Sequence, residues 1–266
     1  ITKGTRMAQF ENRVRTAGTV QRQGADVDQG LRSYMLGVYN YMAGGVALTG
    51  LIAYALFALA VTNDPAAAAA TLKGGKMLTS FGVLLYTSPL KWVLMFAPLA
   101  FVFFFAVRAN RMSVAGAQTS FWAYAALVGA SISVILLVYT GASIARVFFI
   151  SSATFAALGA YGYTTKKDLT GWGTFLFMGM IGILIASIVN LIFLQSTAMQ
   201  FATSVLGVLI FAGFTAYDTQ RIKDDYFAFA HDGEMAAKAS VFGALALYQD
   251  FVGLFMNMLS LMGDRE

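Results

Sequence analysis

The chain has 266 residues, of which 58% are hydrophobic and only 12% are charged. Ordinary globular domains carry about 25% charged residues, so this composition excludes a large water-soluble domain and predicts a membrane protein. The lack of cysteine in the sequence excludes disulfide scaffolds, zinc ribbons and cysteine nucleophiles. The single histidine, His231, also excludes a histidine-cluster metal site and a haem held by two histidines.

Seven apolar segments are each long enough to cross a hydrocarbon core, which takes about 20 residues of helix. These segments are approximately 34–61, 91–107, 119–140, 143–163, 175–195, 198–219 and 240–263. Helices are favoured over strands because the segments are apolar on all sides, whereas the strands of a membrane barrel alternate. The expected fold class is therefore all-α, a polytopic membrane protein with seven transmembrane helices.

The sequence predicts three regions, namely a polar and basic arm at 1–33, a seven-helix transmembrane domain at 34–263 and a short tail at 264–266. The arm lacks a sustained apolar stripe, which is typical of a solvated segment that contacts anionic lipid only electrostatically. No cleavable signal is expected, because the first span is too long and follows a polar segment. Residues 64–88 are expected to form the longest external loop, and no nucleic-acid partner is expected.

The basic residues fall mainly on one side of the predicted topology. Thirteen lysines and arginines lie before the first span or in the loops after the second, fourth and sixth spans, whereas four lie in the remaining loops and the tail. Lys and Arg concentrate on the cytoplasmic side of membrane proteins. The N-terminus is therefore expected in the cytoplasm and the C-terminus outside, in a bacterial inner membrane or an organellar inner membrane.

Two carboxylates interrupt the last two spans. Asp218 lies at the end of the sixth span, and Asp250 lies midway through the seventh. A charge near the bilayer centre costs at least about 2.5–3.5 kcal/mol, so such residues usually face the bundle interior and mark an ion or proton path. For Asp218 alone, an equally simple interpretation is that it ends its helix at the cytoplasmic interface.

Asp250 shares one helix face with four small or polar residues spaced by three or four positions. These residues are Gly243, Ala246, Gly253 and Asn257. Small residues at this spacing let a neighbouring helix approach closely. If that neighbour is the sixth span, Asp218 and Asp250 come within hydrogen-bonding distance, and two carboxylates in a desolvated site share a proton. Such a pair can respond to pH, and its oxygens can bind a hard cation such as calcium.

The segments that carry these aspartates resemble a known family. AYDTQRIK at 216–223 and ALALYQDFVGLFMNML at 244–259 are similar to the paired C-terminal signature of the Bax inhibitor family, also called transmembrane Bax inhibitor motif proteins. Matching segments lie upstream in order, with YNYMAGGVALTG in the first span, SIARVFFISSATFAALGAYGYTTKKDLTGWG across the fourth and SIVNLIFL in the fifth. The resemblance extends from residue 34 to the end and favours a bacterial member.

The resemblance implies a fold in which six helices surround a central, carboxylate-bearing seventh. It also implies a pH-sensitive calcium or cation leak channel gated by the pair Asp218 and Asp250. In the family, an arginine near the cytoplasmic end of the second helix latches onto the aspartate of the sixth, and Arg108 and Arg111 both fit that position. The resemblance implies no catalytic residue and no cofactor, with calcium as the one candidate metal at the aspartate pair.

Two enzyme or pump classes fit the sequence poorly. An intramembrane aspartyl protease needs a glycine two residues before its second aspartate and a later Pro-Ala-Leu element, whereas Tyr248 holds the glycine position and no proline follows Asp250. A retinal pump needs a lysine in the last span, and residues 240–263 contain none. The chain is therefore not expected to be an enzyme.

A non-transporting regulator is the main alternative. Some bacterial relatives modulate FtsH, a membrane-anchored ATP-dependent protease, and eukaryotic relatives are linked to stress and to suppression of cell death. On this alternative, the basic arm is the segment that contacts the protein partner.

Overall fold

The computed structural model of the chain describes residues 3–72, 74–229 and 231–265, although not the side chains of 3–28 or 110. Within these residues, seven helices are long and apolar enough to cross a membrane. The seven spans are Gln29–Ala60, Leu90–Arg108, Val114–Val138, Gly141–Thr164, Trp172–Leu194, Thr197–Phe229 and Gly233–Met262. Each overlaps one predicted segment, so the all-α fold class and the seven spans are confirmed.

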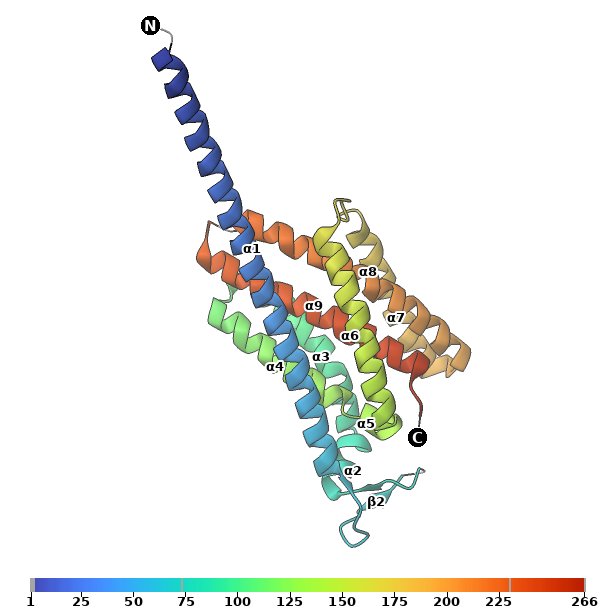
Figure 1. Cartoon of the computed structure of the whole chain (residues 1–266). Helices are drawn as coiled ribbons and strands as arrows, with labels where there is room; N and C mark the ends of the chain where they lie inside the picture. The colour runs from blue at the N-terminus through green and yellow to red at the C-terminus, as the bar shows by residue number, and fades with distance from the viewer. Residues whose placement is uncertain (1–2, 73, 230, 266) are drawn as a thin grey trace.

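Seven long helices form the bundle in Figure 1, together with two short elements that extend two of them. The long helices are α1 (Lys3–Ala60), α3 (Leu90–Arg108), α4 (Val114–Ile132), α6 (Gly141–Thr164), α7 (Trp172–Val189), α8 (Thr197–Phe229) and α9 (Gly233–Met262). The four residues of α5 (Ile135–Val138) follow α4, and the π-helix η2 (Asn190–Leu194) follows α7. Ser113, Thr140 and Asp232 begin α4, α6 and α9, because their side-chain oxygens accept backbone N–H groups of the first turn.

α1 is much longer than the span that it contains. It continues without a break from Lys3 to Ala60, so the predicted arm is helical from residue 3 onward and runs directly into the first span. Figure 1 shows the first part of α1 extending beyond the other helices as a rod. The arm has no sustained apolar stripe, and an apolar stripe is the pattern by which a helix is recognised in a sequence. The boundary between arm and membrane domain stays a prediction.

The segment between α1 and α3 contains a small sheet that the sequence did not predict. Three antiparallel strands lie in the order β1-β3-β2, with bounds Val61–Thr62 for β1, Ala70–Thr71 for β2 and Met77–Leu78 for β3. The short helix α2 (Ser80–Tyr86) follows, and the Thr79 hydroxyl caps it by accepting the Gly82 N–H at 3.1 Å. Two-residue strands are too short to show the alternation that identifies a strand.

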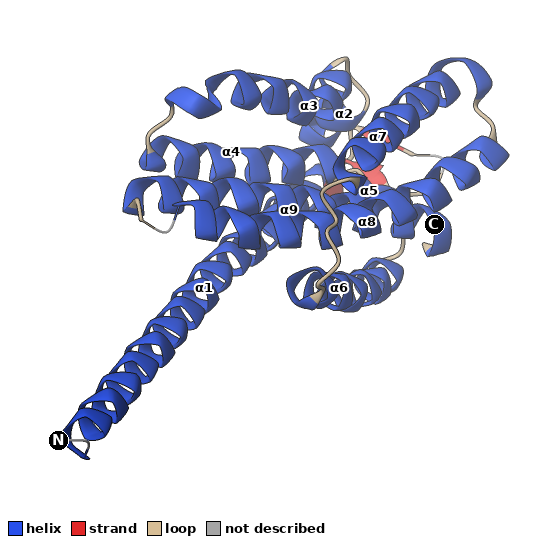
Figure 2. Cartoon of the chain, turned by 90° about the horizontal axis from the view of Figure 1, so that it is seen from above, coloured by secondary structure: helices blue, strands red, loops and turns tan. Residues whose placement is uncertain are grey.

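The spans form three layers when the bundle is viewed from above. Figure 2 shows α4, α9 and α8 in the middle layer, α3 and α7 on one face of it, and α1 and α6 on the other. α9 packs against α8, α1, α6 and α4 and has the largest buried share of the spans, whereas α3 packs chiefly on α4 and α7 on α8. Four of the six other long helices therefore pack closely on α9. The predicted ring of all six helices around the seventh stays a prediction.

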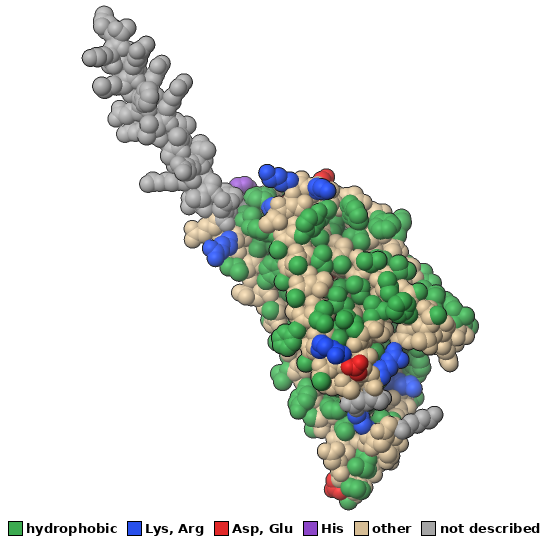
Figure 3. Space-filling model, turned by 45° about the vertical axis from the view of Figure 1, so that its right-hand side comes forward, with side chains coloured by type: hydrophobic (Ala, Val, Ile, Leu, Met, Phe, Trp, Pro, Cys, Tyr) green, Lys and Arg blue, Asp and Glu red, His purple; other side chains and the backbone are tan. Residues whose placement is uncertain are grey.

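The outer surface of the bundle has the composition that a lipid environment requires. Figure 3 shows hydrophobic side chains spread across one face, with Lys, Arg and Asp or Glu gathered toward its two ends. Many large apolar side chains on this surface are more than half exposed, including Phe103, Phe149, Phe175, Met178 and Phe193. Soluble monomers rarely expose continuous apolar patches of this extent, whereas hydrocarbon tails solvate them without cost.

Gly129 of α4 lies so close to α1 that no side chain fits between the two helices. A Cβ at this position would lie 2.6 Å from the Thr49 carbonyl oxygen and 3.0 Å from the Ile52 Cβ. We expect Gly129→Ala to lower the free energy of unfolding by about 1–3 kcal/mol, because the helices must move apart. The denaturation midpoint in detergent measures this effect.

Gly182→Ala in α7 is the matched control, because a Cβ at Gly182 meets nothing within 4 Å. We expect it to keep the stability or raise it by up to about 1 kcal/mol, since alanine has the higher helix propensity. Equal losses in the two variants would contradict the close α1–α4 contact.

Candidate functional site

The last two helices bring Asp218 and Asp250 together inside the bundle. Asp218 of α8 is only 6% exposed, and Asp250 of α9 is only 4% exposed. The two carboxyl groups lie within hydrogen-bonding reach of each other. A carboxylate only accepts hydrogen bonds, so a hydrogen bond between the two groups requires a proton on one of them. A pair that shares one proton carries one negative charge.

Small residues on α9 allow the close approach to α8 that this contact needs. A Cβ at Gly243 would lie 2.9 Å from Ile222, and a Cβ at Gly253 would overlap the Phe211 ring. Asn257 faces α8 as well, because a Cβ at Gly207 would overlap its amide group. Ala246, the remaining member of the predicted packing face, is half-buried on the same helix.

Arg221 is the cation beside the aspartate pair. Its Nη2 lies 3.1 Å from Asp218 Oδ1, one helical turn along α8, and its side chain is 48% exposed. Its guanidinium also lies 5.8 Å from the centre of the Tyr217 ring, within cation–π range. The charge of Arg221 acts on Asp250 and on Asp225 as well. Arg221 therefore links the buried pair to the surface of the bundle.

Arg108 and Arg111, the predicted latch residues, lie elsewhere. Arg108 is exposed at the end of α3, with its guanidinium 5.8 Å from the centre of the Phe104 ring. Arg111 is exposed in the one-turn helix η1 (Ala109–Arg111). Neither forms an ion pair with Asp218 among the described residues, so a latch from α3 stays a prediction. The sequence signal for Arg221 was its spacing of three residues from Asp218, which places both on one helix face.

The pair offers oxygen atoms to a cation without completing a site for one. Asp218 Oδ1 and Asp250 Oδ2 are buried, and neither accepts a well-oriented hydrogen bond from the described residues, although Arg221 lies 3.1 Å from Asp218 Oδ1 as an ion pair. In the same part of the chain, no group of three or more His, Cys, Asp or Glu side chains is placed to hold a metal. Calcium takes six to eight oxygen ligands, so a calcium ion at this pair needs water or carbonyl oxygens besides the two carboxyl groups.

A second set of polar side chains holds α9 in one orientation about its axis. The Thr49 hydroxyl donates to the Ala125 carbonyl at 2.8 Å and shares a 2.6 Å hydrogen bond with the Tyr248 hydroxyl. The Gln249 amide donates to the Tyr124 hydroxyl at 3.3 Å. These bonds connect α1, α4 and α9 through the two residues that precede Asp250. They hold the helix so that Asp250 faces α8, and no local sequence pattern predicts them.

Polar residues also line the α8–α9 contact at the end remote from Arg221. The Ser204 hydroxyl donates to the Ser260 hydroxyl at 2.9 Å, and the Gln200 amide donates to the same oxygen at 3.4 Å. The Asn257 amide, which lies about one turn closer to Asp250 than Ser260 does, donates to the Gly253 carbonyl at 2.8 Å. The contact between the two helices is therefore polar at both ends, with the Phe211 ring against Gly253 between them.

These features define a class of protein, a polytopic helical membrane protein with a buried acidic pair between its last two spans. Residues 31–266 match the family model described as "Inhibitor of apoptosis-promoting Bax1". The chain belongs to the Bax inhibitor family.

Bacterial membrane proteins are among its relatives. The chain is 45% identical over 247 residues to an uncharacterized protein of Caulobacter vibrioides, with 92% of this chain and 94% of the relative covered. It is 43% identical over 239 residues to the uncharacterized protein RP147 of Rickettsia prowazekii, with 90% and 92% covered. It is 38% identical over 240 residues to the inner membrane protein YbhL of Escherichia coli, with 89% and 94% covered.

Infrared spectroscopy tests whether Asp218 and Asp250 share a proton. We expect the protein at neutral pH to show the C=O band of a protonated carboxyl group, and Asp250→Asn to remove it, because an amide donates the hydrogen bond without an added proton. Asp224→Asn is the matched control, since Asp224 is exposed on α8. A wild-type spectrum without the band at neutral pH would show that both carboxyl groups are ionised and that no proton is shared.

Proposed function

We propose that the chain is a pH-sensitive cation leak channel with calcium as the transported cation, gated by the Asp218–Asp250 pair. The burial of two neighbouring carboxyl groups inside the bundle carries this proposal. Ionisable residues inside a membrane bundle mark ion and proton paths, because their insertion has to be offset by a function. The resemblance of the aspartate segments to the Bax inhibitor signature supports the same function.

Gating follows from the charge of the pair. With one shared proton, its single negative charge is balanced by Arg221, 3.1 Å from Asp218. Loss of the proton leaves an excess negative charge that attracts a divalent cation in place of the guanidinium. A second proton neutralises the pair and removes this attraction. Cation entry is therefore favoured as the pH rises.

The contact between α8 and α9 provides the path in this proposal. Its far end is lined by hydroxyl and amide groups, and small residues keep the two backbones close. The Phe211 ring against Gly253 separates that end from the aspartate pair, so conduction requires this contact to open. On the predicted orientation, with the N-terminus in the cytoplasm, Arg221 stands at the cytoplasmic mouth.

Calcium flux into liposomes tests the role of the pair. We expect Asp218→Asn and Asp250→Asn each to lower the flux about fivefold or more and to remove its rise with pH, because neither variant pair can reach a charge of minus two. Asp224→Asn on the same helix serves as control and is expected to keep both. Unchanged flux in the two buried variants, with the wild type conducting, would overturn the proposal.

The latch is tested by three arginine variants in the same assay. We expect Arg221→Gln to raise the flux at neutral pH about threefold, because the guanidinium no longer competes with the cation for Asp218. Arg108→Gln and Arg111→Gln are matched controls, since each removes one exposed charge at the end of α3. A larger effect at Arg108 or Arg111 than at Arg221 would assign the latch to the second span, as the family resemblance implies.

A regulator of a membrane-anchored ATP-dependent protease of the FtsH type is the second candidate. The observation that favours it is the helical extension of α1 beyond the bundle, in a segment whose sequence is rich in arginine. On this proposal, removal of residues 1–28 abolishes co-purification of the protease and leaves the liposome flux unchanged. Retention of the protease by the truncated chain would contradict it.

A further inference from the structure

Two adjoining cavities lie between α1 and α6 at the depth of the membrane. The larger has a volume of about 500 Å³ and the smaller about 170 Å³. They are one continuous groove, because four residues line both cavities, namely Val46, Gly50, Phe148 and Phe251. We call it the α1–α6 groove. All four of these residues lie inside membrane spans, so the groove opens onto hydrocarbon.

The groove exists because α1 and α6 both pack on α9 without packing closely on each other. Figure 1 shows α9 passing behind these two helices. On the α1 side, Ala43, Ala47 and Gly50 are exposed, and a Cβ at Gly50 would meet nothing within 4 Å. The Phe251 ring forms part of the groove from the α9 side. The groove is therefore a shaped, apolar depression in the lipid-facing surface.

The groove is closed at the end nearest the cytoplasmic mouth. The Tyr39 hydroxyl of α1 lies close to the Thr219 side chain of α8, so its ring lies between the two helices. Its hydroxyl also lies against Gly159 of α6, where a Cβ would lie 2.9 Å from it. A bound chain therefore cannot continue past Tyr39 toward that surface.

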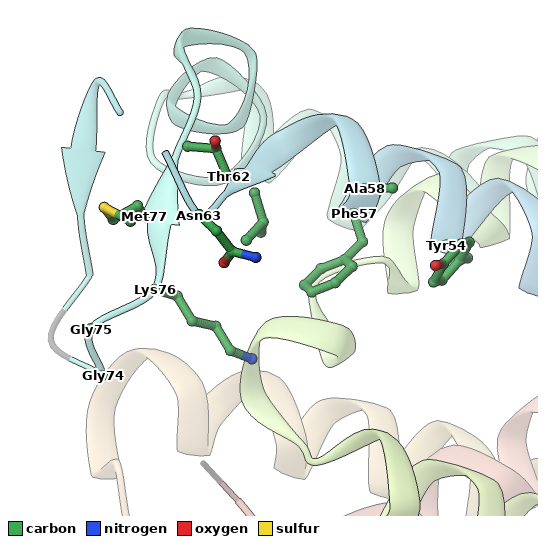
Figure 4. A pocket seen from close by; sticks show the side chains of 10 residues that line it. Tyr54, Phe57, Ala58, Thr62, Asn63, Gly74, Gly75, Lys76 and Met77 are labelled. Atoms are coloured by element: carbon green, nitrogen blue, oxygen red, sulfur yellow. The ribbon is translucent and has the colours of Figure 1, made fainter. Parts of the chain in front are cut away.

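At its other end, the groove meets a polar cavity of about 540 Å³ beside the three-stranded sheet. Tyr54 lines both this cavity and the groove. Figure 4 shows Asn63 and Lys76 projecting into the cavity opposite Phe57. The Lys76 ammonium lies 5.7 Å from the centre of the Phe57 ring and donates to the Leu136 carbonyl at 3.2 Å. The cavity thus adds polar groups and a positive charge to the open end of an apolar groove.

We propose that this combined site binds one phospholipid, with an acyl chain in the α1–α6 groove and the phosphate headgroup in the cavity at Asn63 and Lys76. An apolar groove that ends in a basic, polar cavity matches the amphipathic chemistry of a phospholipid. From Tyr39 to Tyr54 the groove is about 22 Å long at 1.5 Å per helical residue. One leaflet contributes about 15 Å of hydrocarbon, so a single acyl chain fits within this length. The lipid comes from the leaflet on the side of the sheet.

The lipid is retained by the shape of the groove. The hydrophobic effect does not favour the groove over the bilayer, because the acyl chain is surrounded by apolar groups in both places. The groove surrounds the chain with side chains from three helices, and the phosphate adds an electrostatic contact at the end. The site stands apart from the proposed leak, since neither Asp218 nor Asp250 lines any part of it.

Native mass spectrometry tests the site after the full-length protein is reconstituted in nanodiscs of phosphatidylglycerol and phosphatidylethanolamine and then released into detergent. We expect one phospholipid per chain in the wild type and about fivefold less in Gly50→Phe, because the new ring fills the groove. Gly182→Phe is the matched control, since Gly182 is an equally open glycine on α7 outside the groove. Ala47→Phe provides a second filling variant if Gly50→Phe does not fold.

Three outcomes overturn the proposal in whole or in part. Equal lipid retention in the wild type and in the filling variants would show that the groove does not hold the lipid. A lipid-free dimer that the filling variants abolish would show that a second copy of the chain covers the groove instead. Lys76→Gln is expected to lower retention of phosphatidylglycerol about threefold and to leave retention of uncharged diacylglycerol unchanged, and equal loss of both lipids would refute the headgroup placement.

Discussion

The structure depends on one constraint, the burial of two carboxyl groups between α8 and α9 inside a membrane bundle. Hydrocarbon cannot solvate a charge, so two buried carboxyl groups require close contact with each other and a cation nearby. Each requirement has a structural counterpart. Glycines on α9 bring the helices close, the carboxyl groups meet, and Arg221 reaches Asp218 from the next turn of α8. The acidic pair is therefore at once a source of instability and the feature that gives the bundle its chemistry.

α9 must keep one rotation about its axis for this pair to form. The three consecutive residues Tyr248, Gln249 and Asp250 point in directions about 100° apart, and all three find polar partners on different neighbours. Tyr248 meets Thr49 of α1, Gln249 meets Tyr124 of α4, and Asp250 meets Asp218 of α8. A helix that satisfies three polar groups on three sides has few alternative rotations, because each would leave a buried polar group unpaired. The middle layer is thus ordered by polar contacts, whereas the outer helices pack on it through apolar surfaces.

The sequence predicted the parts of this arrangement that depend on local pattern. Hydropathy located seven spans, and the rarity of charge within them identified Asp218 and Asp250. The three layers and the partners of Tyr248 and Gln249 depend on which helices become neighbours, and no local pattern encodes that. The ion-pair partner of Asp218 shows the same limit. The structure places Arg221 of the same helix against the carboxylate, and the latch from Arg108 or Arg111 that the family resemblance implies stays a prediction. The two-residue strands carried no detectable signal at all.

Adjacent positions on α9 face two different environments, and this links the acidic pair to the proposed lipid site. Asp250 faces α8, while Phe251, the next residue, lines the α1–α6 groove. α9 is a continuous helix through this region, so a rotation that separates Asp250 from Asp218 also moves the Phe251 ring. An acyl chain in the groove resists that movement, because the ring has to displace it or pack against it anew. On the proposed functions of the two sites, the charge of the pair and the occupancy of the groove then act on the same rotation from adjacent faces of one helix. If both proposals hold, lipid composition is a physical input to the gate, although neither carboxyl group lines the groove.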